Sequence, residues 1–152
     1  LNPGRAQISI IGMSHPPYFE KIAEALRMMG TQQALVVRGL EGEPELSISS
    51  ITKAIELRDD RIAPLSLQPK DFDLAFEPIE NMQSPGLDGE AAVLAKILGD
   101  EFTGNMRDWV VMNAAMILYI GGKASSIRDA VALAQATLAS GAAKKKLAEL
   151  SQ

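Results

Sequence analysis

Two short apolar runs, separated by an amphipathic segment, constrain the fold of this chain most strongly. Residues 8–13 (ISIIGM) and residues 34–38 (ALVVR) each have the length and apolar content of a buried strand. The segment between them carries apolar residues at the spacing of one helix face: Phe19, Ile22, Ala23 and Leu26. Gly30 follows and would end that helix. This order predicts two parallel strands joined by a right-handed helical crossover.

The middle of the chain predicts an antiparallel hairpin. Residues 51–57 and 62–67 are strand-like and flank the polar turn Arg58-Asp59-Asp60-Arg61. Pro64 cannot donate a ladder hydrogen bond, so the second strand is expected at an edge of the sheet. Residues 68–85 contain three prolines and little periodicity, and we expect a loop with one short turn there.

The rest of the chain predicts helices. We expect one helix that Asp88 caps and Gly99 stops, one over about residues 103–120, one that Ser125 or Ser126 caps, and a short last one over residues 142–150. The predicted fold is therefore α/β: a mostly parallel sheet flanked by helices, with an antiparallel hairpin and a C-terminal helical cluster. Asn113 falls within the apolar stripe of the second of these helices, and we expect it to be a structural amide that ties a loop or strand to the helix.

Composition excludes several kinds of chemistry. The chain of 152 residues is 47% apolar and 22% charged, as in a globular domain. It has no cysteine and a single histidine, His15, so thiol chemistry, disulfides and a multi-histidine metal site are excluded within it. No apolar run reaches the length of a membrane-spanning helix, and we expect a cytoplasmic protein. The net charge of −4 argues against nucleic-acid binding.

The loop after residues 34–38 is the candidate functional site. It contains Gly39 and Gly42 and three carboxylates, Glu41, Glu43 and Glu45. Open α/β sheets bind ligands at the carboxyl ends of their strands, and carboxylates there suit Mg²⁺ beside a substrate phosphate. The alternative is a solvated acidic turn after a core strand. Neither common glycine-rich phosphate motif occurs in the chain, so the residues alone name no reaction.

The order of several short motifs resembles the anthranilate phosphoribosyltransferase family. The matching segments run collinearly through the chain: Leu1-Asn2-Pro3-x-Arg5-x-Gln7, residues 34–47 (ALVVRGLEGEPELS), residues 91–94 (AAVL), residues 113–115 (NAA), residues 122–124 (GKA) and residues 130–134 (AVALA). Members of this family transfer a 5-phosphoribosyl group from phosphoribosyl pyrophosphate (PRPP) to anthranilate in tryptophan biosynthesis. Their fold is a small helical domain with a larger α/β domain, and Mg²⁺ bridges the diphosphate to carboxylates.

The resemblance implies specific roles for residues of this chain. Asn2, Arg38 and Gly39 are the candidate substrate-binding residues, Glu45 and Glu43 are the candidate Mg²⁺ ligands, and no residue is assigned a catalytic role. The family's helical domain and its glycine-rich diphosphate loop would precede Leu1. We therefore expect residues 1–152 to be the C-terminal part of the α/β domain of a longer, homodimeric parent. By themselves they are expected to be inactive.

Two positions depart from the family pattern in this loop. Arg38 stands where the family commonly has histidine, and Pro44 stands where it commonly has aspartate, which removes one expected oxygen ligand. These two residues, together with His15-Pro16-x-Tyr18, resemble a paralogous class with the same fold and without clear anthranilate transfer. The alternative function is therefore a non-catalytic paralogue that binds nucleic acid or another polyanion.

Overall fold

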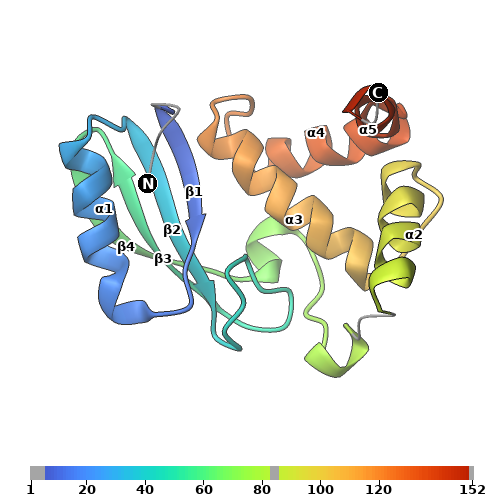
Figure 1. Cartoon of the computed structure of the whole chain (residues 1–152), viewed down its shortest axis with the longest axis horizontal. Coiled ribbons are helices and arrows are strands. Elements are labelled where there is room, and N and C mark those ends of the chain that lie inside the picture. The colour runs from blue at the N-terminus through green and yellow to red at the C-terminus, as the bar shows by residue number, and fades with distance from the viewer. Residues whose placement is uncertain (1–5, 83–85, 151–152) are drawn as a thin grey trace.

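A four-stranded mixed sheet forms one half of the computed structural model, which describes residues 6–82 and 86–150 (Figure 1). Its strands lie side by side in chain order: β1 (Ile8–Gly12), β2 (Gln33–Gly39), β3 (Thr52–Arg58) and β4 (Arg61–Leu67). β1 and β2 are parallel, whereas β2–β3 and β3–β4 are antiparallel. The α/β class is as predicted, but the sheet, which was expected to be mostly parallel, is mixed: among the described strands only one pairing of three is parallel. The loop over residues 40–51 contains no helix, so β3 returns antiparallel to β2.

The first strand–helix–strand unit matches the sequence prediction. The short 3₁₀ turn η1 (Pro16–Tyr18) leads into α1 (Phe19–Met28), which covers one face of the sheet (Figure 1). Its predicted stripe is largely buried, and it packs against Ala34 and Val36 of β2. Burying an apolar side chain of this size stabilises the fold by about 1.5–3 kcal/mol.

The hairpin is also confirmed. Asp59 and Asp60 both have positive φ, at 50° and 61°, as a two-residue hairpin turn of the primed type requires. Aspartate tolerates this left-handed region better than most residues. Pro64 lies in β4 at the edge of the sheet, as expected, because a proline there leaves no interior ladder bond unmade.

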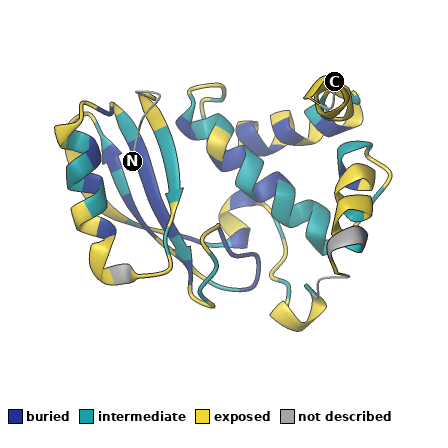
Figure 2. Cartoon of the chain, in the orientation of Figure 1, coloured by how far each residue is buried: buried dark blue, intermediate teal, exposed yellow. Residues whose placement is uncertain are grey.

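The other half of the molecule is helical. It contains α2 (Leu87–Leu98), α3 (Asn105–Ile120), α4 (Ile127–Ala139) and α5 (Ala142–Leu150), and α3 lies between the sheet and α2 (Figure 1). Buried residues concentrate on β2 and on α3 and α4 (Figure 2), where Leu35 and Val37 meet Val111, Met112 and Ala130 in one core. None of the helices in the described ranges is long and apolar enough to cross a membrane.

The start of α2 and the segment over residues 68–82 differ in detail from the predicted ones, whereas the start of α4 is as predicted. Asp88 does not occupy the cap position of α2, because the helix already begins at Leu87 and Gly86 is its N-cap residue. Ser126 does cap α4, accepting a hydrogen bond from the Asp129 backbone N–H at 3.1 Å. In the segment predicted as loop, two short 3₁₀ turns form, η2 (Pro69–Phe72) and η3 (Ile79–Asn81), and Phe72 is completely buried.

Candidate functional site at the end of the second strand

The acidic loop leaves β2 at its carboxyl end and folds back on itself. The Gly39 N–H donates to the Glu43 carbonyl oxygen at 3.0 Å, and the Leu40 N–H donates to the Ile51 carbonyl oxygen at 3.2 Å. Gly42 has a φ of +114°, which a side-chain-bearing residue rarely adopts. The loop is therefore an ordered turn built on its glycines.

Helix α3 fixes the second half of this loop. The Asn113 side chain accepts from the Leu46 N–H at 3.0 Å and donates to the Leu46 carbonyl oxygen at 3.2 Å. The Trp109 indole N–H donates to the same carbonyl oxygen at 2.6 Å. The prediction that Asn113 is a structural amide joining a loop to the helix is confirmed.

The loop also packs directly on the end of β1. A Cβ atom added to Gly12 would lie 1.8 Å from the Pro44 carbonyl oxygen and 2.6 Å from the Pro44 Cβ, so only glycine fits there. Pro44, which replaces the aspartate expected from the resemblance, is thus in close contact with the edge strand.

Glu45 is exposed and lines an open cavity of about 700 Å³, which we name the Glu45 cavity. It lies between the ends of β1 and β2 and helix α3. Besides Glu45 its walls are formed by apolar residues and two polar side chains: Ile10, Gly12, Val37, Pro44, Leu46, Glu90, Met106, Trp109, Val110, Asn113, Ala114 and Ile117. A mostly apolar hollow with a few polar groups at a strand end is the usual form of a small-molecule site.

Glu43 does not share this cavity. It lines a smaller one of about 140 Å³, the Glu43 cavity, and its Oε2 atom is enclosed without a hydrogen-bond partner. Glu41 instead accepts a hydrogen bond from the Ser50 hydroxyl at 2.5 Å. The two predicted metal ligands therefore lie in different cavities, and residues 6–82 and 86–150 hold no group of three or more metal-binding side chains.

The loop still fits Mg²⁺ in one respect. Mg²⁺ is commonly held by only one or two protein carboxylates, with water and substrate phosphates completing its six oxygen ligands. Glu45 offers one exposed carboxylate at the mouth of a large cavity, and no hydrogen bond or ion pair engages it in the described part of the chain. Pro44 contributes no side-chain oxygen.

Of the predicted substrate-binding residues, the two that the structure describes, Arg38 and Gly39, do not line this cavity. Side chains alternate along a strand, so Arg38 points to the α1 face with Val36, whereas Val37 faces the core beside α3. Arg38 is partly buried, its Nε atom has no acceptor among the described residues, and in register it faces Lys53 of β3. Gly39 is buried at the end of β2, and Asn2 lies outside the described residues.

Sequence reasoning missed two residues that shape the site. Gly12 belongs to a predicted apolar strand. A glycine at the end of a strand indicates that another segment of backbone approaches closely, as Pro44 does here. Trp109 belongs to the apolar stripe of a predicted helix. A buried indole N–H needs a hydrogen-bond acceptor, and this requirement indicates a contact with another segment. Both position the loop, and neither carries chemistry of its own.

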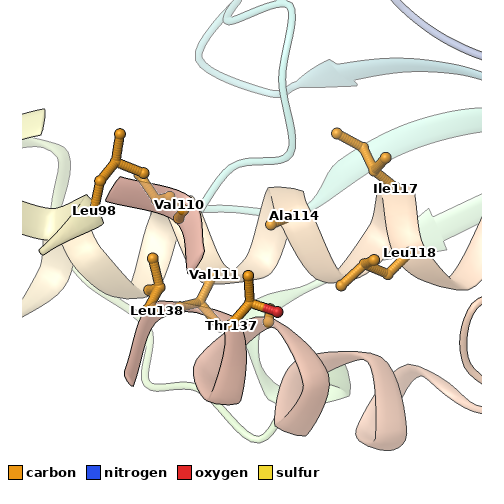
Figure 3. Close-up of a pocket in the computed structure, with 10 residues that line it drawn as sticks. Leu98, Val110, Val111, Ala114, Ile117, Leu118, Thr137 and Leu138 are labelled. Atoms are coloured by element: carbon orange, nitrogen blue, oxygen red, sulfur yellow. The ribbon is translucent and has the colours of Figure 1, made fainter. Parts of the chain in front are cut away.

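A separate apolar pocket of about 280 Å³ lies among the helices (Figure 3). Leu98 of α2, Val110 of α3 and Leu138 of α4 are among its walls. Among the described residues that line it, Thr137 alone has a polar side chain, and its hydroxyl donates to the Leu133 carbonyl oxygen within α4 at 2.8 Å.

Both the sequence and the fold match known proteins. Residues 1–144 match the sequence model described as glycosyl transferase family, a/b domain. The chain is 37% identical to an anthranilate phosphoribosyltransferase from Nitrosomonas eutropha and 36% identical to one from Methanocorpusculum labreanum. Each alignment covers 98% of this chain and 43% of the relative, so the chain spans less than half the length of these proteins.

Solved structures of anthranilate phosphoribosyltransferases resemble the fold of this chain. The anthranilate phosphoribosyltransferase of Thermus thermophilus superimposes with a TM-score of 0.78 at 29% identity, over 91% of this chain and 40% of that one. The Saccharomyces cerevisiae enzyme in complex with PRPP and Mg gives a TM-score of 0.82 at 20% identity, over 92% of this chain and 40% of that one, which shows the shared fold. The sequence model of the a/b domain of the glycosyl transferase family matches residues 1–144, and the chain therefore belongs to this family.

Proposed function

We propose that the whole protein transfers a 5-phosphoribosyl group from PRPP to the amine of anthranilate, in tryptophan biosynthesis. The observation that carries the proposal is the position of Glu45, an exposed carboxylate at the carboxyl end of a parallel strand, on the wall of a cavity of about 700 Å³. Relatives that carry the name of this activity match almost the whole chain.

Mg²⁺ is the cofactor that the site would take. Bound there with PRPP, the ion would neutralise the charge that builds up on the departing diphosphate. We propose Glu45 as the protein carboxylate that holds it, because Glu45 alone of the two predicted ligands lines the large cavity. The prediction that Glu43 is a second ligand rests on the resemblance.

Substrate contacts by Arg38, Gly39 and Asn2 remain proposals. The Arg38 guanidinium has an enclosed Nε–H without an acceptor among the described residues, so it could donate to a phosphate oxygen once the loop is in place around a ligand. It would do so from the α1 face, apart from Glu45. A cytoplasmic location and a homodimeric parent are proposed with the same function.

The alternative function, a non-catalytic paralogue that binds nucleic acid, has less support. The relatives named above are transferases, and the net charge of −4 opposes a polyanionic partner. It predicts an affinity for single-stranded or duplex nucleic acid that falls steeply as salt concentration rises.

The test uses the protein at the full length of its relatives. Calorimetric titration with PRPP and Mg²⁺ should release or absorb heat, and anthranilate should be consumed with formation of pyrophosphate. Glu45→Gln should weaken binding of PRPP with Mg²⁺ while thermal unfolding stays within about 0.5 kcal/mol of the parent, as for an exposed substitution. Absence of both binding heat and turnover in the parent protein would reject the proposal.

A further inference from the structure

Two cations lie side by side near the carboxyl end of β2, on the α1 face of the sheet. Arg38 of β2 and Lys53 of β3 are partners in the antiparallel register, so their side chains share a face, with Cβ atoms about 4.5–5.5 Å apart. The next residues of the same face along the two strands, Val36 and Ile55, pack in the core under α1. Like charges directly opposite each other destabilise a sheet unless something offsets them.

No carboxylate offsets this pair in the described part of the chain. None of the ion pairs or hydrogen bonds there involves the side chain of either cation. The loop carboxylates of Glu41 and Glu43 lie against the other face of β2, where a Cβ atom added to Gly39 would be 3.2 Å and 3.3 Å from their Oε2 atoms. Glu20 of α1 lines a groove on the α1 face and also forms no ion pair with a described residue.

The guanidinium of Arg38 is partly ordered before any ligand binds. The residue is half-buried, and a Cβ atom added to Gly42 would lie 3.7 Å from Arg38 Nη2, so the guanidinium lies against the backbone of the acidic loop. A side chain that is already confined loses less freedom on binding, which favours affinity. Lys53 is exposed and supplies its charge from the solvent side.

The chemistry of the two side chains indicates a doubly charged oxyanion. A guanidinium presents its N–H donors in a planar fork that matches the oxygens of a phosphate, and an ammonium adds three more donors. On its other side Lys53 faces Ser66 of β4, whose hydroxyl can donate to an oxyanion and carries no charge. Two cations are balanced by a dianion, and a phosphate monoester carries about 1.5–2 negative charges at pH 7.

We propose that Arg38 and Lys53 together bind the phosphate group of a small phosphate monoester on the α1 face of the sheet. Arg38 is the bidentate donor and Lys53 provides the second positive charge. Neither residue lines the Glu45 cavity, so this site is separate from the proposed Mg²⁺ site and does not depend on the proposed transferase activity.

The test is a titration of the whole isotope-labelled chain with methyl phosphate at constant ionic strength, followed by amide NMR shifts. At about pH 7.5 this monoester is a dianion, since its second pKa is about 6. Shifts should cluster at residues 37–42 and 52–54, with millimolar affinity, as expected for so small a ligand. Dimethyl phosphate, a diester with a single negative charge, should bind about fivefold more weakly.

Three charge-removing variants provide the matched comparison. Arg38→Gln removes the fork and its charge, so methyl phosphate affinity should fall about tenfold, and Lys53→Gln should lower it about fivefold. Lys123→Gln is the control in the turn after α3, near the end of β3 where Arg58 lies over the Tyr119 ring. It removes an equal, exposed charge far from the pair and should change affinity by less than about twofold. Thermal unfolding shows whether each variant is folded.

Several outcomes would overturn the proposal. Equal losses in Arg38→Gln and Lys123→Gln would mean that the anion responds only to the overall charge of the chain. Equal affinity for methyl phosphate and dimethyl phosphate would mean that one negative charge is enough, as for a phosphodiester. If Lys53→Gln leaves the affinity unchanged, the two cations do not act on one ligand. Absence of shifts at residues 37–42 and 52–54 would show that no small phosphate binds there.

Discussion

Asn113 satisfies both backbone polar groups of Leu46, with its amide oxygen 3.0 Å from the Leu46 nitrogen and its amide nitrogen 3.2 Å from the Leu46 oxygen. The two residues are 67 positions apart in the chain. This reciprocal pair joins the loop that carries Glu45 to the middle of α3. The position of the candidate ligand therefore depends on the packing of a distant helix.

Replacing this amide should destabilise the protein measurably. Asn113→Ala leaves the Leu46 N–H without its acceptor in a partly buried setting, and we expect the free energy of unfolding to fall by about 1–3 kcal/mol. Denaturant unfolding followed by circular dichroism measures this. Gln135→Ala on α4 removes an exposed amide and should change stability by no more than about 0.5 kcal/mol. Equal effects of the two substitutions would show that the Leu46 contact contributes nothing.

Gly12 should tolerate no side chain. In Gly12→Ala the new methyl group would collide with the Pro44 carbonyl oxygen, 1.8 Å from its ideal position, so either β1 or the loop must move. We expect a loss of about 1–3 kcal/mol in the free energy of unfolding, typical of overpacking. Ser9→Ala in the same strand is the control, and its midpoint of denaturation should stay near that of the parent. A Gly12→Ala protein as stable as this control would mean that the loop can withdraw from β1 at no cost.

Most of the architecture could be predicted because it rests on local patterns. The helix stripe at Phe19, Ala23 and Leu26 has a period near 3.6, and both halves of the hairpin end at the Asp59-Asp60 turn. The sequence does not predict the antiparallel pairing of β2 with β3, because nothing in residues 40–51 indicates whether that long loop crosses over the sheet or returns beside β2.

The site itself could be predicted only in part. The sequence identified the acidic loop, and it identified Asn113 as a structural amide. It could not place Glu43 and Glu45 in different cavities, because the loop conformation is set by Trp109 and Asn113, which are remote in sequence. Phe72 was missed for a similar reason, since its burial is decided by tertiary packing within a proline-rich segment without periodicity.

The stability of the fold should depend on the ionisation of Asp108, in the first turn of α3. Burial raises the pKa of this carboxyl above 3.8, outweighing the attraction of Arg107, and the nearby charge of Glu77 raises it further. A carboxyl with a raised folded-state pKa binds its proton more tightly in the folded protein. Its contribution therefore favours folding at low pH and declines as pH rises from 3.8 through the folded-state pKa.

Asp108→Asn should remove this decline. We expect the variant to be more stable than the parent at neutral pH, and the advantage to disappear below pH 3.8, in unfolding midpoints measured across pH. Glu80→Gln, which neutralises an exposed carboxylate, serves as the control and should follow the parent curve. If Asp108→Asn were instead less stable at neutral pH, attraction between the carboxylate and the helix N-terminus would exceed the cost of burial.

Restoring a carboxylate at position 44 should strengthen metal binding at the Glu45 cavity. Pro44→Asp keeps the Cβ atom that lies against Gly12 and adds an oxygen ligand next to Glu45. One more unit charge about 4 Å from a cation contributes about 1 kcal/mol in a water-like dielectric, so Mg²⁺ affinity should rise roughly fivefold. Calorimetry of the full-length protein with Mg²⁺ and PRPP measures this. Pro44→Asn, which has the same shape without the charge, should give a smaller gain. If aspartate and asparagine leave the affinity equally unchanged, the metal does not sit beside residue 44, and the role proposed for Glu45 falls with it.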